Sequence, residues 1–330
     1  MSRLKGTSTV AEALRERVER VEEALHALLP HPSAFPEVIH ESMRYSTLGG
    51  GKRLRAVLLM EAAALVSALP AARRASPDEA SVHITPELMR SVGAAPAAGA
   101  AVEMVHAFSL IHDDLPCMDD DDLRRGKPTN HKVYGEGIAV LAGDGLLARA
   151  FEVTARLPWA GTDHQTAALV TAELAMAVGS GGIVGGQVAD IQSESRSFDD
   201  SSLDSHETLA YIHAHKTGAL FVASLRIGGI IGGMTPDELA QLTSFGESIG
   251  LVFQIVDDIL DVEGEASAMG KNVGGDEERG KLTYPALYGL DASKRRVAEE
   301  MERAGSALDV FGEKAAFLRA LAEAMALRRS

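Results

Sequence analysis

Two clusters of aspartates carry most of the chemistry that this sequence could perform. The first lies in residues 111–126, where six aspartates and two arginines follow a long apolar run. The second lies in residues 257–261, again inside an apolar run. Carboxylates in segments that should be buried need protons, partner groups or metal ions to neutralise them. Because clustered oxygen ligands suit Mg²⁺, we expect a site where Mg²⁺ bridges aspartates to a phosphorylated substrate. For either cluster alone, a solvated acidic surface is the alternative.

The second cluster has helical spacing. Gln254, Asp257, Asp258 and Asp261 fall at i, i+3, i+4 and i+7, and every other position from 251 to 262 is apolar. Such a helix should be buried on all sides, so its acidic stripe should face an internal cavity. Like charges four residues apart repel one another, and a bound cation would remove that cost.

The first cluster follows a predicted helix at residues 98–115. Glu103, His106 and Asp113 share one face of this otherwise apolar segment. Pro116 cannot donate a backbone hydrogen bond and should end or kink the helix. The remaining aspartates should lie at or beyond that end.

Basic residues gather at a glycine run. Gly50 and Gly51 precede Lys52, Arg53 and Arg55 at the start of an apolar helix. Backbone N–H groups at a helix start attract anions, so this segment is a candidate phosphate site, although basic residues on a solvent-facing helix would look the same. A second glycine-rich and lysine-containing loop, residues 270–285, could fold over a phosphate as a lid.

Composition limits the class of protein. The chain has 330 residues, 46% of them hydrophobic, and a formal net charge of -15, which argues against a general binder of nucleic acid or anionic membranes. A single cysteine, Cys117, excludes an intrachain disulfide and is compatible with a reducing compartment. The apolar stretch 91–111 contains Glu103 and His106, so we interpret it as a buried helix and not as a membrane span.

Helical patterns dominate the chain, and alternating strand patterns are nearly absent. The expected helices cover residues 10–29, 34–45, 98–115, 134–157, 166–178, 206–215, 217–231 and 250–262. Residues 71–86 are polar, contain prolines and resemble a surface connection, and residues 193–205 should form a loop. The fold class expected from these patterns is all-α.

In these motifs the sequence resembles the trans-isoprenyl diphosphate synthases, the family of farnesyl and geranylgeranyl diphosphate synthases. Asp113-Asp114, four residues and then Asp119, followed by Arg124-Arg125-Gly126, match the first aspartate-rich motif of the family. Asp257-Asp258-Ile259-Leu260-Asp261 after Phe253-Gln254 match the second. The remaining matches are segment 50–55, Gly186-Gln187, Lys216-Thr217 and the segment 281–285. The resemblance covers about residues 35–290.

The resemblance implies an isoprenoid synthase-type bundle of antiparallel helices around a central cavity, formed by a single domain over residues 1–330 and usually assembled as a homodimer. It implies condensation of isopentenyl diphosphate with an allylic diphosphate (dimethylallyl, geranyl or farnesyl diphosphate) to give a C15 or C20 product. The leaving diphosphate would be stabilised by about three Mg²⁺ ions and cationic side chains. Apolar walls would protect the carbocation from water.

Site residues can be carried over position by position from this resemblance. The implied metal ligands are Asp113, Asp114, Asp119, Asp257, Asp258 and Asp261. The implied substrate-binding residues are Lys52, Arg55, His106, Arg124, Arg125, Lys216, Thr217, Gln254, Lys271 and Lys281. The residues expected to carry catalysis are Asp113, Asp119, Lys216 and Asp257. No protein base is nominated, because the proton is thought to go to the bound diphosphate in this family.

Product length should depend on Phe108 and Ser109, five and four residues before Asp113. Phe108 lies about 7.5 Å along a helix from Asp113, and an aromatic floor there favours C15, whereas simple core packing is the alternative role. Residues 115–136 instead resemble plastid-type geranylgeranyl synthases. The sequence therefore leaves C15 and C20 open.

Other functions remain open at this point. A class I terpene cyclase, a non-catalytic subunit of a heteromeric synthase and a calcium-binding structural protein would each share part of the acidic pattern. Two intact aspartate motifs and the scattered basic residues favour the synthase. We expect a cytoplasmic protein that is not an integral membrane protein, or a plastid protein if a transit peptide has been removed.

Overall fold

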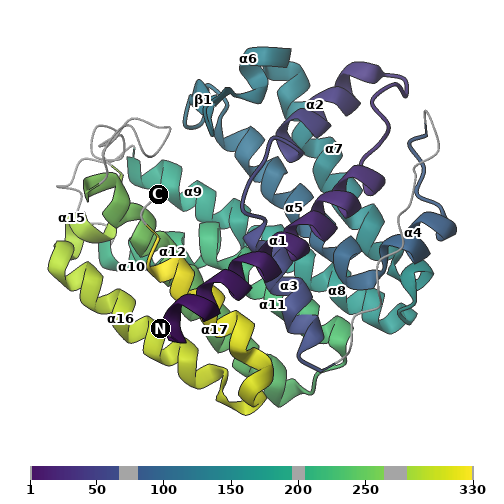
Figure 1. The fold of residues 1–330 in the computed structure, drawn as a ribbon. Helices are drawn as coiled ribbons and strands as arrows, with labels where there is room; N and C mark the ends of the chain where they lie inside the picture. Colours follow the sequence, from purple (N-terminus) through teal and green to yellow (C-terminus); the bar gives the residue numbers. More distant parts are fainter. Residues whose placement is uncertain (1, 67–80, 195–204, 264–280, 329–330) are drawn as a thin grey trace. The chain divides into compact units, whose positions relative to one another are not determined.

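The computed structural model describes residues 2–66, 81–194, 205–263 and 281–328, and this part of the chain is almost entirely helical (Figure 1). The expectation of an all-α fold is confirmed. One short antiparallel hairpin interrupts the helices, with β1 (Leu123–Arg124) paired to β2 (Lys127–Pro128). Its turn residues Arg125 and Gly126 have φ values of 53° and 74°. Positive φ at both central residues is what a two-residue hairpin turn of type I′ requires.

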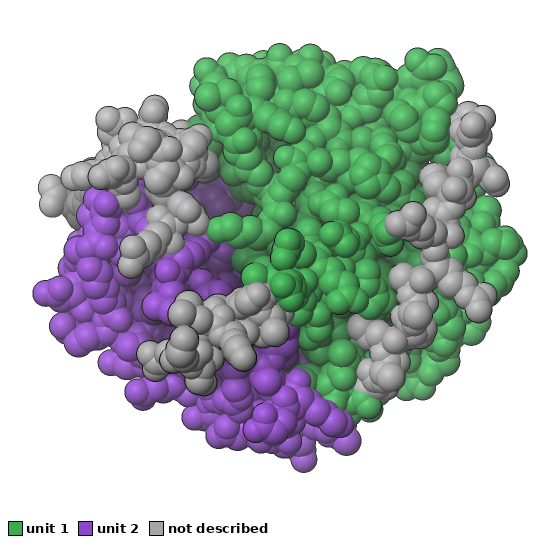
Figure 2. Space-filling view, viewed as in Figure 1, with its two compact units in different colours: residues 1–174, 226–234 green, residues 175–225, 235–330 purple. Residues whose placement is uncertain are grey.

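The chain forms two compact units, which Figure 2 distinguishes by colour. Unit 1 comprises residues 1–174 and 226–234, and unit 2 comprises residues 175–225 and 235–330. That the chain forms a single domain stays a prediction.

Unit 1 is built around the apolar helix α5, which packs against α7, α3 and α1. Alanines 97, 98, 100 and 101 of α5 are at most 1% exposed, and a Cβ on Gly99 would lie 3.2 Å from the Cβ of Ala56. Small side chains therefore allow α5 and α3 to approach closely. The helices of this unit are α1 (Ser2–Leu28), α2 (Glu37–Thr47), α3 (Leu54–Ala64), α4 (Pro86–Val92), α5 (Ala94–Asp113), α6 (Asn130–Tyr134), α7 (Glu136–Ala155) and the 3₁₀ turn η1 (Leu157–Ala160).

Unit 2 is organised by the long helix α12, which contacts α16, α15, α17 and the turn η2. Its elements are α9 (Ile183–Glu194), α10 (Ser205–Ile212), η2 (His213–Gly218), α12 (Pro236–Glu263), α15 (Tyr284–Tyr288), α16 (Leu290–Ala307), η3 (Asp309–Ala315) and α17 (Ala316–Ala326). Two further helices, α8 (His164–Val178) and α11 (Ala219–Gly232), contribute residues to both units.

The expected helices are present, and most of their ends agree within a few residues. Two begin well before the expected residue: α1 begins at Ser2 and not at residue 10, and α12 begins at Pro236 and not at residue 250. The segment expected to break at residues 215–217 is a π-helical turn, η2, that continues from α10 into α11. The glycine-rich segment 179–186 enters α9, which begins at Ile183. Three of the predicted segments lie mostly outside the described residues: the connection at 71–86, the loop at 193–205 and the lid at 270–285.

Three described segments are long and apolar enough to cross a membrane by length and composition alone: Ala94–Asp113, His164–Ser193 and Pro236–Glu263. In the first, 78% of the most apolar window is buried inside the protein itself. This burial agrees with the interpretation of α5 as a core helix.

Candidate functional site

The first aspartate motif begins where α5 ends. Asp113 is the last residue of α5, and the following loop returns to it, because the backbone N–H of Asp119 donates to the carbonyl oxygen of Asp113 at 2.8 Å. Both residues are half-buried. The structure therefore brings together the two aspartates that the sequence places six positions apart.

Asp114 has a different environment, although it is the neighbour of Asp113. It is only 3% exposed, and the Nε of Arg124 donates to its two oxygens at 2.7 and 2.9 Å. Burial alone would lower the pKa of Arg124, but the hydrogen bond and charge of Asp114 raise it above the usual value. The chain itself thus neutralises Asp114. That Asp114 binds a metal stays a prediction, and its visible role is to hold Arg124.

A basic cluster lies in the same unit. The Nη1 of Arg55 lies 3.4 Å from the Nε2 of His106, and Arg125 donates to the carbonyl oxygen of Gly50. Lys52 is exposed beside this glycine run. A pocket lies nearby, and its lining includes Gly49, Asp114, Arg124, Arg125 and Lys127. The glycine run and the arginines after the first motif therefore meet, as an anion site requires.

His106 sits among these cations. Burial lowers its pKa well below the usual value, and the charges of Arg55, Arg125, Arg124 and Arg53 lower it further. The imidazole is therefore neutral at pH 7. A neutral ring can still donate one N–H to an anion without adding to the local charge.

Acidification should destabilise the protein through His106. Below pH 6.5 the unfolded chain binds a proton at this histidine that the folded chain refuses, so the free energy of unfolding falls as pH falls, by at most about 1.4 kcal/mol per pH unit. We expect His106→Gln to lose less stability than wild type between pH 7 and pH 5, as measured by urea unfolding. The exposed His83→Gln is the control, and equal losses in wild type and His106→Gln would contradict the prediction.

Arg53, the middle cation of the glycine run, turns inward. It is 5% exposed and contacts Glu22 at 2.7 Å, Glu103 at 3.4 Å and the carbonyl oxygen of Thr47 at 2.7 Å. Glu103 is 3% exposed and also accepts the backbone N–H of Ala56 at 3.3 Å. Of the three cations near the glycines, Arg53 thus fixes the start of α3, while Lys52 and Arg55 flank it.

The predicted chain-length residues lie on α5. Phe108 is 8% exposed and meets His112 edge-on at 4.9 Å, and the Nε2 of His112 lies 3.0 Å from the carbonyl oxygen of Val140 in α7. A Cβ at Gly143 would lie 2.2 Å from that nitrogen, so any larger residue there would require the His112 ring to move. Half-buried Ser109 donates to the carbonyl oxygen of His106 at 3.0 Å.

In unit 2 a chain of hydrogen bonds surrounds the second motif. The hydroxyl of Thr217 donates to Gln254 at 2.9 Å, and the Gln254 amide donates to Asp258 at 2.9 Å. The other oxygen of Asp258 accepts the backbone N–H of Tyr284 at 2.9 Å. Three segments that sequence reasoning matched to one family are therefore joined through Asp258, which is 3% exposed. Burial lowers the pKa of the adjacent His213 to about 4 against the opposing charge of Asp190, so this ring is neutral at pH 7.

Lys216 lies in the π-helical turn, a form of helix that often marks functional sites. Its Nζ contacts Asp190 of α9 at 2.5 Å. A Cβ on Gly186 would lie 2.2 Å from the backbone nitrogen of Lys216, so α9 can approach the turn only because residue 186 is glycine. Sequence reasoning matched Gly186 but assigned no role to Asp190, and the available signal was a carboxylate four residues after the matched glycine.

Asp257 and Asp261 differ from Asp258 in that both are half-buried. Arg328 forms an ion pair with Asp257, donates to the carbonyl oxygen of Phe253 at 3.0 Å and stacks over the Phe253 ring at 4.1 Å. Arg328 was not identified from the sequence. Its guanidinium shows that Asp257 attracts a cation.

The described residues therefore divide the predicted site into two local groups. In unit 1 the structure brings together Asp113, Asp119, Arg124, Arg125, Arg55 and His106. In unit 2 it brings together Lys216, Thr217, Gln254, Asp257 and Asp258. Lys281 begins the described segment before α15, and Lys271 lies outside the described residues. The metal and substrate roles of all these residues stay predictions.

Comparisons with known proteins point in one direction. A family profile described as polyprenyl synthetase matches residues 36–315. The chain is 47% identical to the chloroplastic geranylgeranyl pyrophosphate synthase of Capsicum annuum, over 89% of this chain and 72% of that protein. It is 45% identical to a chloroplastic heterodimeric geranylgeranyl pyrophosphate synthase large subunit of Arabidopsis thaliana, over 95% of this chain and 78% of that protein. The crystal structure of an FPP/GFPP synthase from Zymomonas mobilis matches with a TM-score of 0.78 at 33% identity, covering 97% of this chain and 99% of that one.

Proposed function

We infer that this chain, which belongs to the polyprenyl synthetase family and is a prenyltransferase, makes geranylgeranyl diphosphate, the C20 product. The observation that carries this choice is the similarity to geranylgeranyl pyrophosphate synthases at 45 to 47% identity over 89 to 95% of the chain. Its substrates would be isopentenyl diphosphate and allylic diphosphates. The relatives named as chloroplastic support a plastid location, and a homodimer is proposed from the family resemblance.

The donor set fits Mg²⁺. Carboxylate oxygens are the ligands that Mg²⁺ prefers, and the aspartates of both motifs supply only oxygen atoms. We propose Asp113 and Asp119 at the first motif, and Asp257 and Asp261 at the second, as the residues that hold about three ions. Asp114 and Asp258 accept hydrogen bonds from Arg124, Gln254 and Tyr284. Those bonds support a positioning role for these two buried aspartates.

When bound, Mg²⁺ would neutralise negative charge on the departing diphosphate. The cations of the chain assist in the same way: Arg124, which Asp114 orients, and Lys216, which Asp190 orients, would each contact phosphate oxygens. Lys52, Arg55 and Arg125 would bind isopentenyl diphosphate, with neutral His106 donating one hydrogen bond. Buried apolar side chains of α5 would keep water from the carbocation.

A product assay tests the proposal. The purified chain, with Mg²⁺ and labelled isopentenyl diphosphate, would receive C5, C10 or C15 allylic diphosphate separately. Extension of the C15 primer to C20 is the expected result. A C15 end product without use of the C15 primer would replace the C20 proposal by farnesyl diphosphate synthesis. Absence of condensation with every primer would favour a terpene cyclase or a subunit that needs a partner chain.

Replacing Phe108 tests its role in product length. If the ring closes the pocket, Phe108→Ala should shift the main product at least one C5 unit beyond that of wild type, because it removes a large buried ring from α5. If the ring only packs between helices, the products should stay the same while stability falls by about 3–5 kcal/mol. Chromatography of dephosphorylated products, together with urea unfolding, distinguishes these outcomes, and Ser109→Ala is the neighbouring control.

A further inference from the structure

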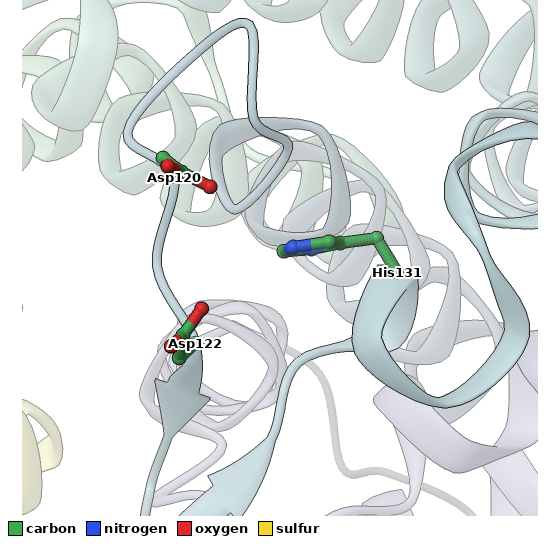
Figure 3. A group of neighbouring side chains, drawn as sticks. All are labelled: Asp120, Asp122 and His131. Carbon is green, nitrogen blue, oxygen red and sulfur yellow. The ribbon is translucent and has the colours of Figure 1, made fainter.

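A second group of ligand-type residues lies beyond the first motif. Figure 3 shows Asp120 and Asp122 on the loop leading into β1, with the ring of His131 of α6 directed toward them. One ligand atom from each of the three side chains lies within 4.8 Å of the other two. None of these residues has a role in the proposed prenyl transfer.

Asp121 lies between these two aspartates in the sequence, but its side chain contacts a different partner. The side chain of Asp121 contacts Arg124 at 3.4 Å, on the side of the Asp114 ion pair. Thr129 fixes the backbone between them, since its hydroxyl donates to the carbonyl oxygen of Asp121 at 2.8 Å and its N–H to that of Asp122 at 3.0 Å. Asp120 adopts a left-handed conformation with a φ of 49°, which costs free energy for a residue other than glycine.

The hydrogen bonds of Thr129 also determine the tautomer of His131. The Nδ1 of His131 lies 3.2 Å from the Thr129 hydroxyl oxygen, and the single hydroxyl proton is already donated to a backbone carbonyl. In the neutral ring, Nδ1 must therefore carry the proton and donate it to Thr129. Nε2 is left as a lone pair, and it has no hydrogen-bond partner among the residues that the structure describes.

A ligand would stabilise the lone pair on the Nε2 of His131. His131 is 7% exposed, so Nε2 is withdrawn from bulk water, and a buried acceptor without a donor is costly. A metal-binding histidine usually has this arrangement, with one nitrogen toward the ion and the other donating to an oxygen that orients the ring. The two carboxylates beside it supply negative charge.

We propose that Asp120, Asp122 and His131 bind one divalent ion of the first-row transition series, with Zn²⁺ as its representative, at a site separate from the Mg²⁺ sites. Imidazole suits such ions, whereas Mg²⁺ prefers oxygen ligands only. An ion bound at about 2.0–2.2 Å from each ligand atom needs those atoms to be no more than about 4.4 Å apart, so small side-chain rotations suffice. Solvent would complete the coordination at the exposed side.

Lys132 competes for this site. Its Nζ contacts Asp122 at 2.6 Å, and that hydrogen bond, with the charges of Asp122, Asp120 and Glu136, raises its pKa. An incoming ion must displace this ammonium. Binding would then tie the loop after Asp119 to the start of α6 and stabilise the folded chain by mass action.

Zn²⁺ binding to the full chain tests the proposal without using activity as the readout. Chelator-treated protein in excess Mg²⁺ would be titrated with Zn²⁺ by calorimetry, and Co²⁺ would be used in parallel to read nitrogen ligation from visible absorption. Wild type should bind one more equivalent of Zn²⁺ than His131→Gln and should show a nitrogen-ligated Co²⁺ spectrum that His131→Gln lacks. Asp122→Asn, at an exposed position, should lower the affinity for this additional Zn²⁺ ion at least about tenfold.

Two controls make the result specific. His164→Gln removes an exposed histidine outside the group and should match wild type. Lys132→Gln removes the competing ammonium and should bind Zn²⁺ more tightly than wild type. Equal Zn²⁺ stoichiometry and affinity in wild type, His131→Gln and Asp122→Asn would overturn the proposal, as would weaker binding in Lys132→Gln. If His131→Gln does not fold, Asp122→Asn and Lys132→Gln still decide the question. The outcome does not depend on whether the chain makes a C20 product.

Discussion

Asp113→Ala should lower kcat for condensation by about 10³-fold, while the protein stays folded. The backbone bond from Asp119 to Asp113 holds these two residues together at the end of α5, so the loss of one carboxylate should also weaken the apparent affinity for Mg²⁺. Turnover at saturating substrates across a Mg²⁺ titration, with circular dichroism as the folding check, measures both effects. Asp257→Ala should behave in the same way.

The neighbouring aspartate provides the sharpest contrast. Asp114→Ala leaves Arg124 without the carboxylate that holds it by two bonds, so we expect lower stability together with weaker diphosphate binding. Asp144→Asn, an exposed carboxylate on α7, is the control that should retain wild-type turnover. If Asp113→Ala kept near-normal turnover at all Mg²⁺ concentrations, the first motif would have no part in the chemistry.

Glu103→Leu should destabilise the protein by about 3 kcal/mol, because it breaks a buried ion pair by removing one partner. Arg53 would keep Glu22 and the carbonyl of Thr47 but lose its most buried charge partner, and the backbone N–H of Ala56 would lose its acceptor. A buried charge that has lost a partner cannot recover its hydration without opening the helix packing. Urea unfolding followed by circular dichroism measures the change.

Two further variants separate the charge from the packing. Glu103→Gln can still accept from Ala56 but carries no charge, so it should fall between wild type and Glu103→Leu. The double variant Arg53→Met with Glu103→Leu removes both charges and should recover part of the lost stability. The stability losses of Arg53→Met alone and of Glu103→Leu alone add up to the loss expected if the two residues did not interact. If the double variant lost more stability than this sum, the interpretation of Arg53 and Glu103 as a buried ion pair would be wrong.

The sequence alone determined the fold class and the two aspartate motifs. Long apolar runs at helical spacing leave few ways to bury their side chains except by packing helices together, which is why the all-α prediction needed no tertiary information. The motif residues are close to one another along single helices or short loops. The grouping around Asp257 follows from helical periodicity, whereas Asp119 returns to Asp113 through the loop that follows α5.

Only the tertiary structure decided which contacts are made by each of several neighbouring residues of the same type or charge. Asp113 and Asp114 are the same residue type in neighbouring positions, but Arg124, ten residues after Asp114, bonds to Asp114. Arg53 is one of three cations at a glycine run, yet Glu22 and Glu103 from two other helices draw it inward. These contacts depend on which groups from distant segments lie side by side. A buried charge is stable only where partner groups neutralise it. The unpaired nitrogen of His131 has the same origin, since it depends on where the hydroxyl proton of Thr129 is donated.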